Sequence, residues 1–252
     1  MYKLICTLLI IATFSASSNA LRIRCDFQNM TWTFGNAYTC LGNVIDNVDE
    51  EVLEIENDGM HPCPFNNSDV WGLFIRNQNV TNLPLDIGWK FPNLRGLECD
   101  NCNLISLRSS MLERLTNLLH FAVPRNRIRN LPGNMFRFTV NLQWVYLHGN
   151  QISNAGLNVL KVLRNLQGIF LAGNGCISSN AMFDQNAVFS IMYGLATGCP
   201  PTKEDFIRDT ENSECTYKNE ETSHSRRKNS RESKSKRIGA DEFVGWRDID
   251  QE

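Results

Sequence analysis

The chain has 252 residues, of which 42% are hydrophobic and 21% are charged, and its formal net charge is -2. This length is sufficient for a sizeable core, and the near balance of charge gives no reason to expect a nucleic-acid partner. After residue 20, no stretch has the ~20 apolar residues that a membrane-spanning helix requires, so we predict no membrane span.

The first 20 residues have the three parts of a secretory signal peptide. Lys3 supplies the positive charge, Leu4 to Phe14 forms the apolar run, and Ser18-Asn19-Ala20 is a small-residue cleavage site. The apolar run is only about half as long as a membrane span. We therefore predict that residues 1–20 are removed and that the protein is secreted to the extracellular space.

Residues 70–183 contain apolar positions that recur every 24 residues. Five repeats begin at Val70, Leu94, Leu118, Leu142 and Leu166. The fourth, sixth, eleventh and eighteenth positions of each repeat are apolar or Cys. The ninth position holds Gln78, Cys102, Asn126, Asn150 and Asn174. This is the leucine-rich repeat pattern L-x-x-L-x-L-x-x-(N or C)-x-L. It predicts an α/β solenoid, a leucine-rich repeat horseshoe of about five repeats with disulfide caps at both ends.

The repeat positions have distinct structural roles. Positions three to seven alternate between outward and inward, so each repeat supplies one short strand of a parallel concave sheet. An Asn amide at the ninth position bonds backbone groups where the chain leaves the sheet. The eighteenth position, Phe183 in the last repeat, is expected to close the core from the convex side. Since one repeat cannot bury its apolar side alone, both ends need caps.

Residues 21–69 are predicted to form an N-terminal cysteine cap and a leading strand. Cys25 and Cys40 enclose aromatic residues that alternate with polar ones around Gly35-Asn36, which indicates a hairpin. In an exported protein, a disulfide between these cysteines would stabilise such a small cap. The apolar stripe from Val52 to Ile55 predicts the leading strand.

Residues 184–201 are predicted to form the C-terminal cap. Helical apolar spacing runs from Ala181 to Thr197 and ends at Gly198-Cys199-Pro200-Pro201. Cys176 occupies the eleventh position of the last repeat, and we predict that it pairs with Cys199.

Four other cysteines follow the signal peptide: Cys63, Cys99, Cys102 and Cys215. Cys63 is expected to reach Cys99 or Cys102, which leaves the other as a buried thiol. Cys215 either pairs locally, stays free, or forms an intermolecular disulfide. The spacing of Cys99 and Cys102 follows from the repeat, and no second ligand pair exists, so we predict no metal site and no cofactor.

Residues 202–252 are rich in charge and poor in aliphatic residues, which predicts a disordered tail. A basic block from Arg226 to Arg237 lies between acidic stretches. Lys234-Ser235-Lys236-Arg237 has the paired-basic form that secretory convertases cut, so release of the segment after Arg237 is an alternative to a tail that only tethers or attracts polyanions.

Three N-x-S/T sequons lie in the first third of the chain, at Asn29, Asn66 and Asn79. Glycans at these sites would shield the N-terminal cap and the first repeat, and they would leave repeats three to five uncovered. A partner is therefore expected at the later repeats.

A catalytic site is not predicted. The chain has four histidines, His61, His120, His148 and His224, and no nucleophile elbow, phosphate loop or zinc-protease motif. His120 and His148 lie in adjacent repeats but are displaced along the strand direction by roughly 13 Å, so they are not expected to share a metal ion. We predict that the protein is not an enzyme.

The third, fifth and seventh positions of each repeat point outward on the concave face. In the later repeats they include His120, Trp144, Tyr146, His148 and Phe170. Because no core lies on that side, we expect these rings to be exposed and to anchor a protein or peptide. In the alternative, they stack on neighbouring strands and complete the sheet. The strands offer only roughly 400 Å², so cap surfaces or a peptide-sized ligand must complete an interface.

The chain resembles the secreted leucine-rich repeat proteins of insects. The resemblance covers about residues 21–201 and is closest in Tyr38-Thr39-Cys40, Gly59-Met60-His61, Asn67-Ser68-Asp69-Val70 and Phe91-Pro92-Asn93-Leu94. Some of these proteins are innate immune factors that associate through disulfides or coiled coils and bind complement-like proteins. The resemblance therefore implies a role in extracellular or innate immune recognition, although this chain lacks the heptad coiled coil of those immune members.

Overall fold

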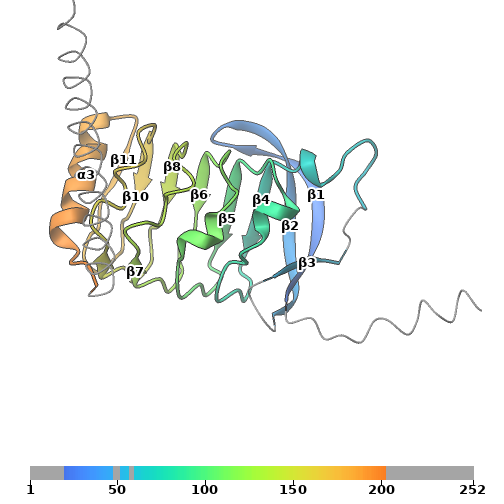
Figure 1. The fold of residues 1–252 in the computed structure, drawn as a ribbon, viewed down its shortest axis with the longest axis horizontal. Coiled ribbons are helices and arrows are strands. Elements are labelled where there is room, and N and C mark those ends of the chain that lie inside the picture. Colours follow the sequence, from blue (N-terminus) through green and yellow to red (C-terminus); the bar gives the residue numbers. More distant parts are fainter. Residues whose placement is uncertain (1–19, 48–51, 57–59, 203–252) are drawn as a thin grey trace, which may run out of the picture. The chain divides into compact units, whose positions relative to one another are not determined.

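Five parallel strands follow one another at the spacing predicted from the sequence (Figure 1). They are β4 (Gly72–Arg76), β5 (Gly96–Asp100), β6 (His120–Ala122), β8 (Trp144–Tyr146) and β10 (Gly168–Phe170). Each strand pairs with the next so that residues one repeat apart are direct neighbours. The predicted parallel sheet of a leucine-rich repeat solenoid is therefore confirmed.

The computed structural model describes residues 20–47, 52–56 and 60–202, which all belong to one folded unit. Of the predicted signal peptide only Ala20 lies in these ranges, and of the predicted tail only Thr202. Cys215 and the basic motif that ends at Arg237 lie outside the described residues. In the ranges that the structure describes, no helix has the length and apolarity to cross a bilayer.

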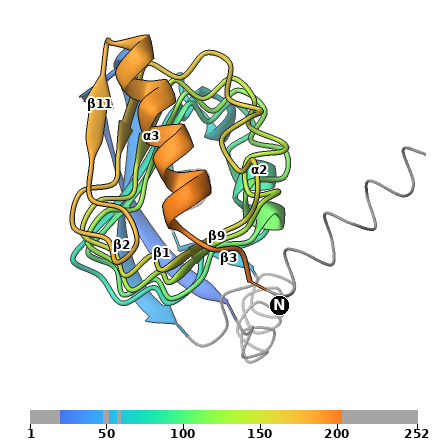
Figure 2. The same cartoon turned by 90° about the vertical axis from the view of Figure 1, so that its left-hand side faces the viewer.

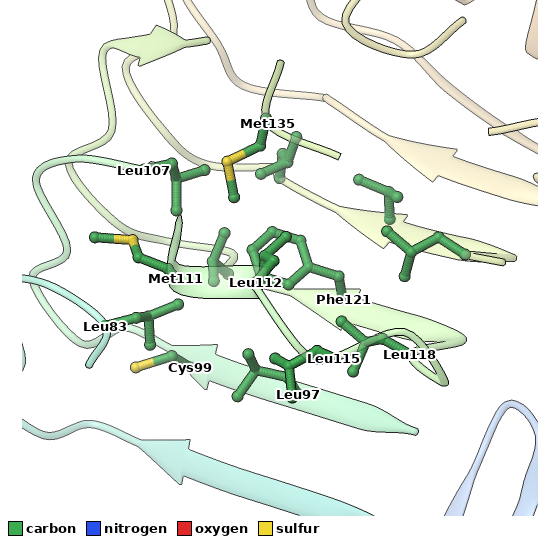
Figure 3. Packing of buried hydrophobic residues seen from close by; sticks show 14 of the residues in the cluster. Leu83, Leu97, Cys99, Leu107, Met111, Leu112, Leu115, Leu118, Phe121 and Met135 are labelled. Carbon is green, nitrogen blue, oxygen red and sulfur yellow. The ribbon is translucent and has the colours of Figure 1, made fainter. Parts of the chain in front are cut away.

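The core lies between the strands and a convex side made of short elements. These elements are α2 (Ile87–Lys90), η3 (Ser109–Leu112), and two strands that pair in parallel, β7 (Asn130–Leu131) and β9 (Asn154–Ala155). The short η2 (Asn67–Asp69) precedes the first repeat strand and has no buried residue. Figure 3 shows Leu97 and Phe121 from the sheet packed towards Met111 and Met135 from the convex side. All four side chains are fully buried. Each such burial contributes about 1.5–3 kcal/mol, and each needs a neighbouring repeat to complete it.

Asparagines at the ninth repeat position join each repeat to the one before it. Asn126 accepts hydrogen bonds from the backbone N–H groups of Cys102 (2.9 Å) and Leu104 (3.0 Å), and its amide donates to the carbonyl of Cys99. Asn150 and Asn174 make the equivalent bonds in the following repeats. The predicted role of this position is confirmed.

The end of the last repeat differs from the prediction. Four complete turns connect the five repeat strands, and the turn after the fifth strand is not completed. After β10 the chain folds back as β11 (Asn180–Met182), which pairs with β10 in the antiparallel direction. The amide oxygen of Asn180 accepts from the N–H groups of Leu171 and Ala172. In earlier repeats the N–H group equivalent to that of Leu171 bonds a carbonyl of the next repeat strand, so Asn180 helps to replace a sixth strand. The prediction that Phe183 closes the core is wrong, since 74% of its surface is exposed.

The N-terminal cap is a long hairpin of β1 (Leu21–Trp32) and β2 (Gly35–Asn47). β2 continues the repeat sheet through parallel pairing with β4, and β3 (Leu53–Ile55) pairs with β1 at the outer edge. The predicted leading strand therefore lies outside the hairpin rather than between it and the first repeat. The sheet has nine strands in the order β11-β10-β8-β6-β5-β4-β2-β1-β3.

The C-terminal cap is α3 (Gln185–Gly198), which crosses the last turn (Figure 2). Asp184 caps its first turn by accepting from the N–H groups of Asn186 and Ala187, and Val188, Ile191 and Leu195 face the core. The helix begins later than the apolar spacing predicted. Ala181 belongs instead to β11, where it pairs with Ile169, because the chain must first complete the sheet edge.

Both predicted disulfides are present, Cys25–Cys40 in the hairpin and Cys176–Cys199 between the last repeat and the end of α3. The expected bridge from Cys63 to the repeats is not formed. Cys63 is exposed, whereas Cys99 and Cys102 are both buried thiols at inward repeat positions. Burial raises the pKa of Cys99 well above its ordinary value, so this thiol stays protonated.

Candidate binding surface

Strand pairing brings the five predicted site residues together. His120, Trp144 and Gly168 form one row across the strands, and Ala122, Tyr146 and Phe170 form the next. The rings of Tyr146 and Phe170 are stacked, with centroids 4.4 Å apart and planes only 3° apart. The ring centroids of His120 and His148 lie 4.9 Å and 6.4 Å from that of Tyr146. The structure thus brings these five residues together, and their role in binding stays a prediction.

The exposure of these rings differs from the expectation. Tyr146, His148 and Phe170 are half-buried, but Trp144 and His120 are only 6% and 7% exposed. The sequence argument that rings on this face have no core to enter is therefore wrong for Trp144 and His120. Trp144 lies against the backbone of Gly168, where a Cβ would collide with its ring.

The tip of the N-terminal hairpin covers part of the same face. Trp32 lies over Gly72 and Gly96, and a Cβ on Gly96 would come within 2.5 Å of its ring. The indole N–H donates to Thr39 (3.0 Å), which fixes the ring in place. Trp32 then meets His120 edge-on at 5.2 Å. The resulting second layer explains why His120 is buried.

Sequence reasoning missed Trp32 as part of this face because the residue precedes the repeats. Glycines at the third repeat position are the signal that could have revealed it. Gly72, Gly96 and Gly168 leave space that a ring from another element can fill. The size of the residue at this position therefore decides whether a second layer can form.

Phe183 is the other missed residue. It follows β11 and meets the Trp144 ring edge-on, with centroids 5.1 Å apart. Its neighbour Met182 is also largely exposed. Because the last repeat folds back, Phe183 reaches the concave side instead of the core. It extends the aromatic cluster beyond the last repeat strand.

A hollow of about 310 Å³ opens beside the aromatic cluster. We call it the concave hollow. Its polar lining comes from Arg76, Glu98, Asp100, Arg125, His120, Tyr146 and His148. Asp100 is 1% exposed, and its Oδ2 accepts from Nε of Arg76 (3.0 Å) and from Nη2 of Arg125. Arg76 and Arg125 themselves remain about half exposed.

Burial controls protonation in the concave hollow. It lowers the pKa of His120 to about 4 and raises that of Glu98, where Arg76 partly opposes the rise. Burial also lowers the pKa of His148, helped by the charge of Arg125. His120 is therefore neutral at physiological pH, and it cannot balance the charge of Glu98.

A larger hollow, of about 480 Å³, lies at the starts of the repeat strands. Its lining includes the asparagine that precedes each repeat from the second to the fifth: Asn93, Asn117, Asn141 and Asn165. The amides of Asn93 and Asn141 donate to the carbonyls of Ser68 and Thr116 in the preceding repeat. Because these amides join neighbouring repeats, we favour the smaller concave hollow as the candidate site.

The three sequon residues, Asn29, Asn66 and Asn79, are all exposed. Among the residues that the structure describes, no group of three or more His, Cys, Asp or Glu side chains could hold a metal ion. The absence of catalysis and of a cofactor stays a prediction.

Comparison with known proteins agrees with the repeat geometry. Residues 92–152 match a family model described as leucine rich repeat. Among curated proteins, none matches this chain. The family match and the asparagine-linked parallel strands define the fold as a leucine-rich repeat solenoid.

Two solved structures are similar to parts of the chain. One is from the Toll–Spätzle complex of Drosophila, with 21% identity and a TM-score of 0.37 over 43% of this chain and 15% of that chain. The other is the leucine-rich repeat ectodomain of the receptor kinase SOBIR1 from Arabidopsis thaliana, with 21% identity and a TM-score of 0.36 over 60% of this chain and 66% of that chain. The chain thus spans only part of each structure.

Proposed function

We propose that the chain is a secreted, non-catalytic module that binds a protein or peptide through its concave face. The stacked pair of Tyr146 and Phe170 is the observation that carries this proposal, because two parallel, half-exposed rings form a rigid apolar platform. His148 borders the platform, and the buried Trp144 and His120 support it. Rigid aromatic anchors of this kind dominate the binding energy of protein interfaces.

Cap residues enlarge the area available for binding. The strands alone offer roughly half of the ~800 Å² that one partner buries in a stable interface. Phe183 and Met182 add exposed apolar surface at one end, and Phe34 at the tip of the hairpin stacks on Trp32 at the other. These additions favour a ligand that runs across several repeats.

Secretion is supported by the predicted signal peptide, the two disulfides and the three exposed sequons. Disulfides persist mainly in oxidising compartments, so both caps suit an extracellular protein. The sequence blocks shared with secreted insect proteins extend the proposal to extracellular recognition of the innate immune kind.

The binding proposal is tested by capture of partners from extracellular fluid. The wild-type protein, Tyr146→Ala and Phe170→Ala are crosslinked in parallel, and the captured proteins are identified by mass spectrometry. Truncation of one anchor costs ~2 kcal/mol or more, so recovery should fall by roughly 30-fold at limiting concentration. Tyr193→Ala is the matched control, because Tyr193 is 73% exposed on α3. Equal recovery with all proteins would refute the role of the concave face.

A processed precursor is the second candidate function, and the paired-basic motif that ends at Arg237 favours it. The intact mass of the secreted protein separates the two candidates. Loss of the last 15 residues supports the precursor, whereas a full-length C-terminus supports the binding module alone.

A covalent partner through Cys215 also remains a proposal, motivated by the position of this cysteine in the charged tail. Non-reducing electrophoresis of the wild type and Cys215→Ser tests it. A higher band that disappears in the variant supports an intermolecular disulfide, and a monomer in both cases refutes it.

A further inference from the structure

The charges in the concave hollow are unequally satisfied. Asp100 receives direct hydrogen bonds from Arg76 and Arg125. Glu98 has only longer ion-pair contacts, with its Oε1 3.6 Å from Arg76 and its Oε2 3.9 Å from Nε2 of His120. Both arginines donate directly to Asp100, so its carboxylate is more fully hydrogen-bonded than that of Glu98.

Three buried polar atoms in the lining of the hollow have no hydrogen-bond partner among the described residues: Oδ1 of Asp100, Nε2 of His120 and Nδ1 of His148. Asp100 and His120 are more than nine-tenths buried. The other ring nitrogen of His120 is hydrogen-bonded to the hydroxyl of Thr33 (3.0 Å), so the orientation of the imidazole is fixed. Buried polar groups are nearly always bonded, so these atoms mark a site that a ligand group can complete.

Among the unsatisfied groups, the carboxylates require a hydrogen-bond donor. The oxygens of Glu98 and Oδ1 of Asp100 are acceptors when ionised. The neutral His120 supplies no positive charge. A basic side chain would supply such donors to the carboxylates of Glu98 and Asp100. The half-buried ring of Tyr146 also favours a cation, through its π face.

We propose that the concave hollow receives a lysine or arginine side chain of the bound protein or peptide, with Glu98 as its charge partner. The inference rests on the proposed function, because the hollow adjoins the platform of Tyr146 and Phe170. The ligand then combines one basic side chain with apolar groups that contact the platform. Ion pairs with a partly buried carboxylate are stronger than exposed ones, so the basic residue gives specificity.

Three synthetic peptides test the charge preference with the full-length chain. Each is a blocked pentapeptide with phenylalanine at both ends and glycine in the second and fourth positions. The central residue is arginine, its uncharged isostere citrulline, or glutamate. Isothermal titration calorimetry should show that the arginine peptide binds at least about tenfold more tightly than the other two. Equal affinities, tighter binding of the glutamate peptide, or no binding of the arginine peptide at millimolar concentration would each overturn the inference.

Two carboxamide variants assign the effect to one residue. Glu98→Gln keeps the shape of the side chain, and burial already disfavours the charged form, so this variant should fold with an unchanged or higher melting temperature. Glu113→Gln is the matched control, because Glu113 is exposed and does not line the hollow. We expect Glu98→Gln to lose the preference for arginine over citrulline and Glu113→Gln to retain it. Retention by Glu98→Gln would refute the assignment.

Failure of this inference can be distinguished from failure of the proposed function. If capture of extracellular partners depends on Tyr146 but the peptides show no charge preference, the concave face binds its ligand without a basic side chain in the hollow. If Tyr146→Ala captures partners as well as the wild type does, the proposed function itself fails.

Discussion

The two halves of the concave face are built from the same repeat but differ in what covers them. In the first two repeats, Gly72 and Gly96 lie beneath Trp32 from the hairpin cap. In the last two, Tyr146 and Phe170 remain half exposed. Trp144 lies on Gly168 in the same manner, but it comes from a repeat strand and leaves its neighbours uncovered. Both tryptophans that lie on a glycine are buried, whereas the stacked rings of Tyr146 and Phe170 stay half exposed.

Removal of Trp32 should have the largest effect on stability, because it uncovers Gly72 and Gly96 in the first two repeats. Trp32→Ala is expected to lower the free energy of unfolding by about 3–5 kcal/mol, since the ring is buried and hydrogen-bonded to Thr39. Urea unfolding measures the change. Trp89→Ala is the control, because this ring is 66% exposed and should cost less than about 1 kcal/mol. Similar losses for the two variants would contradict the two-layer description.

Removal of the C-terminal disulfide should lower the free energy of unfolding nearly as much. It also tests whether the C-terminal cap holds the last repeats in place. The bridge between Cys176 and Cys199 closes a loop with a sequence separation of 23 residues. Replacement of both cysteines by serine should therefore cost about 3 kcal/mol. Binding through Tyr146 and Phe170 should persist below the lowered melting temperature, since neither ring contacts the bridge. Loss of binding in the folded double variant would show that the cap shapes the platform.

Acid should weaken the junction between the two halves, where His120 lies between Trp32 and Tyr146. Its pKa is lowered by burial from 6.5 to about 4, so the unfolded chain binds this proton more readily than the folded chain. The free energy of unfolding therefore decreases as the pH falls below the pKa that His120 has in the unfolded chain. By about pH 4 the loss is on the order of 2–3 kcal/mol.

Two neighbouring groups modify this pH dependence. His148, with a lowered pKa, acts in the same direction as His120, whereas the raised pKa of Glu98 makes the protein less stable as the pH rises. Denaturant unfolding at several pH values should show a smaller acid loss for His120→Gln than for the wild type. An identical pH profile for both proteins would exclude His120 as the group responsible.

Adding one methyl group should have the smallest effect on stability. It tests a single contact, that between Gly96 and the Trp32 ring. Gly96→Ala places a Cβ 2.5 Å from the Trp32 ring, and the shift that this forces should cost about 1–3 kcal/mol. Gly194→Ala is the control, because a Cβ there meets nothing closer than 3.6 Å and α3 gains helix propensity. This control should therefore stabilise the protein by up to about 1 kcal/mol. Thermal unfolding of both variants measures the contrast.

The repeat fold was predictable from the sequence because its determinants are local and periodic. Apolar positions such as Leu97 and Phe121 alternate along a strand, and Asn126 recurs where the chain must turn. Each element repeats at one fixed interval, so the register of the parallel sheet follows from the sequence. Both disulfides were predictable too, since each cap contains two cysteines at suitable positions.

Only part of the candidate site could be predicted in the same way. The pattern placed Tyr146, Phe170 and the two histidines on one face, which the structure confirms. It gave the wrong exposure for Trp144 and His120, because burial on that face depends on glycine and on contacts between elements. Trp32 and His120 are 88 positions apart in the sequence, and no periodicity connects them.

By itself, the sequence determined the repeat length, the strand register, the inward and outward faces, and the cysteine pairs of the caps. These features depend on side-chain periodicity and on chemistry between near neighbours. The tertiary structure alone decided which outward side chains are covered, where the last repeat folds back, and how Asp100 holds two arginines beside Glu98. Those outcomes depend on the packing of segments that are distant in the chain, and no local pattern encodes that packing.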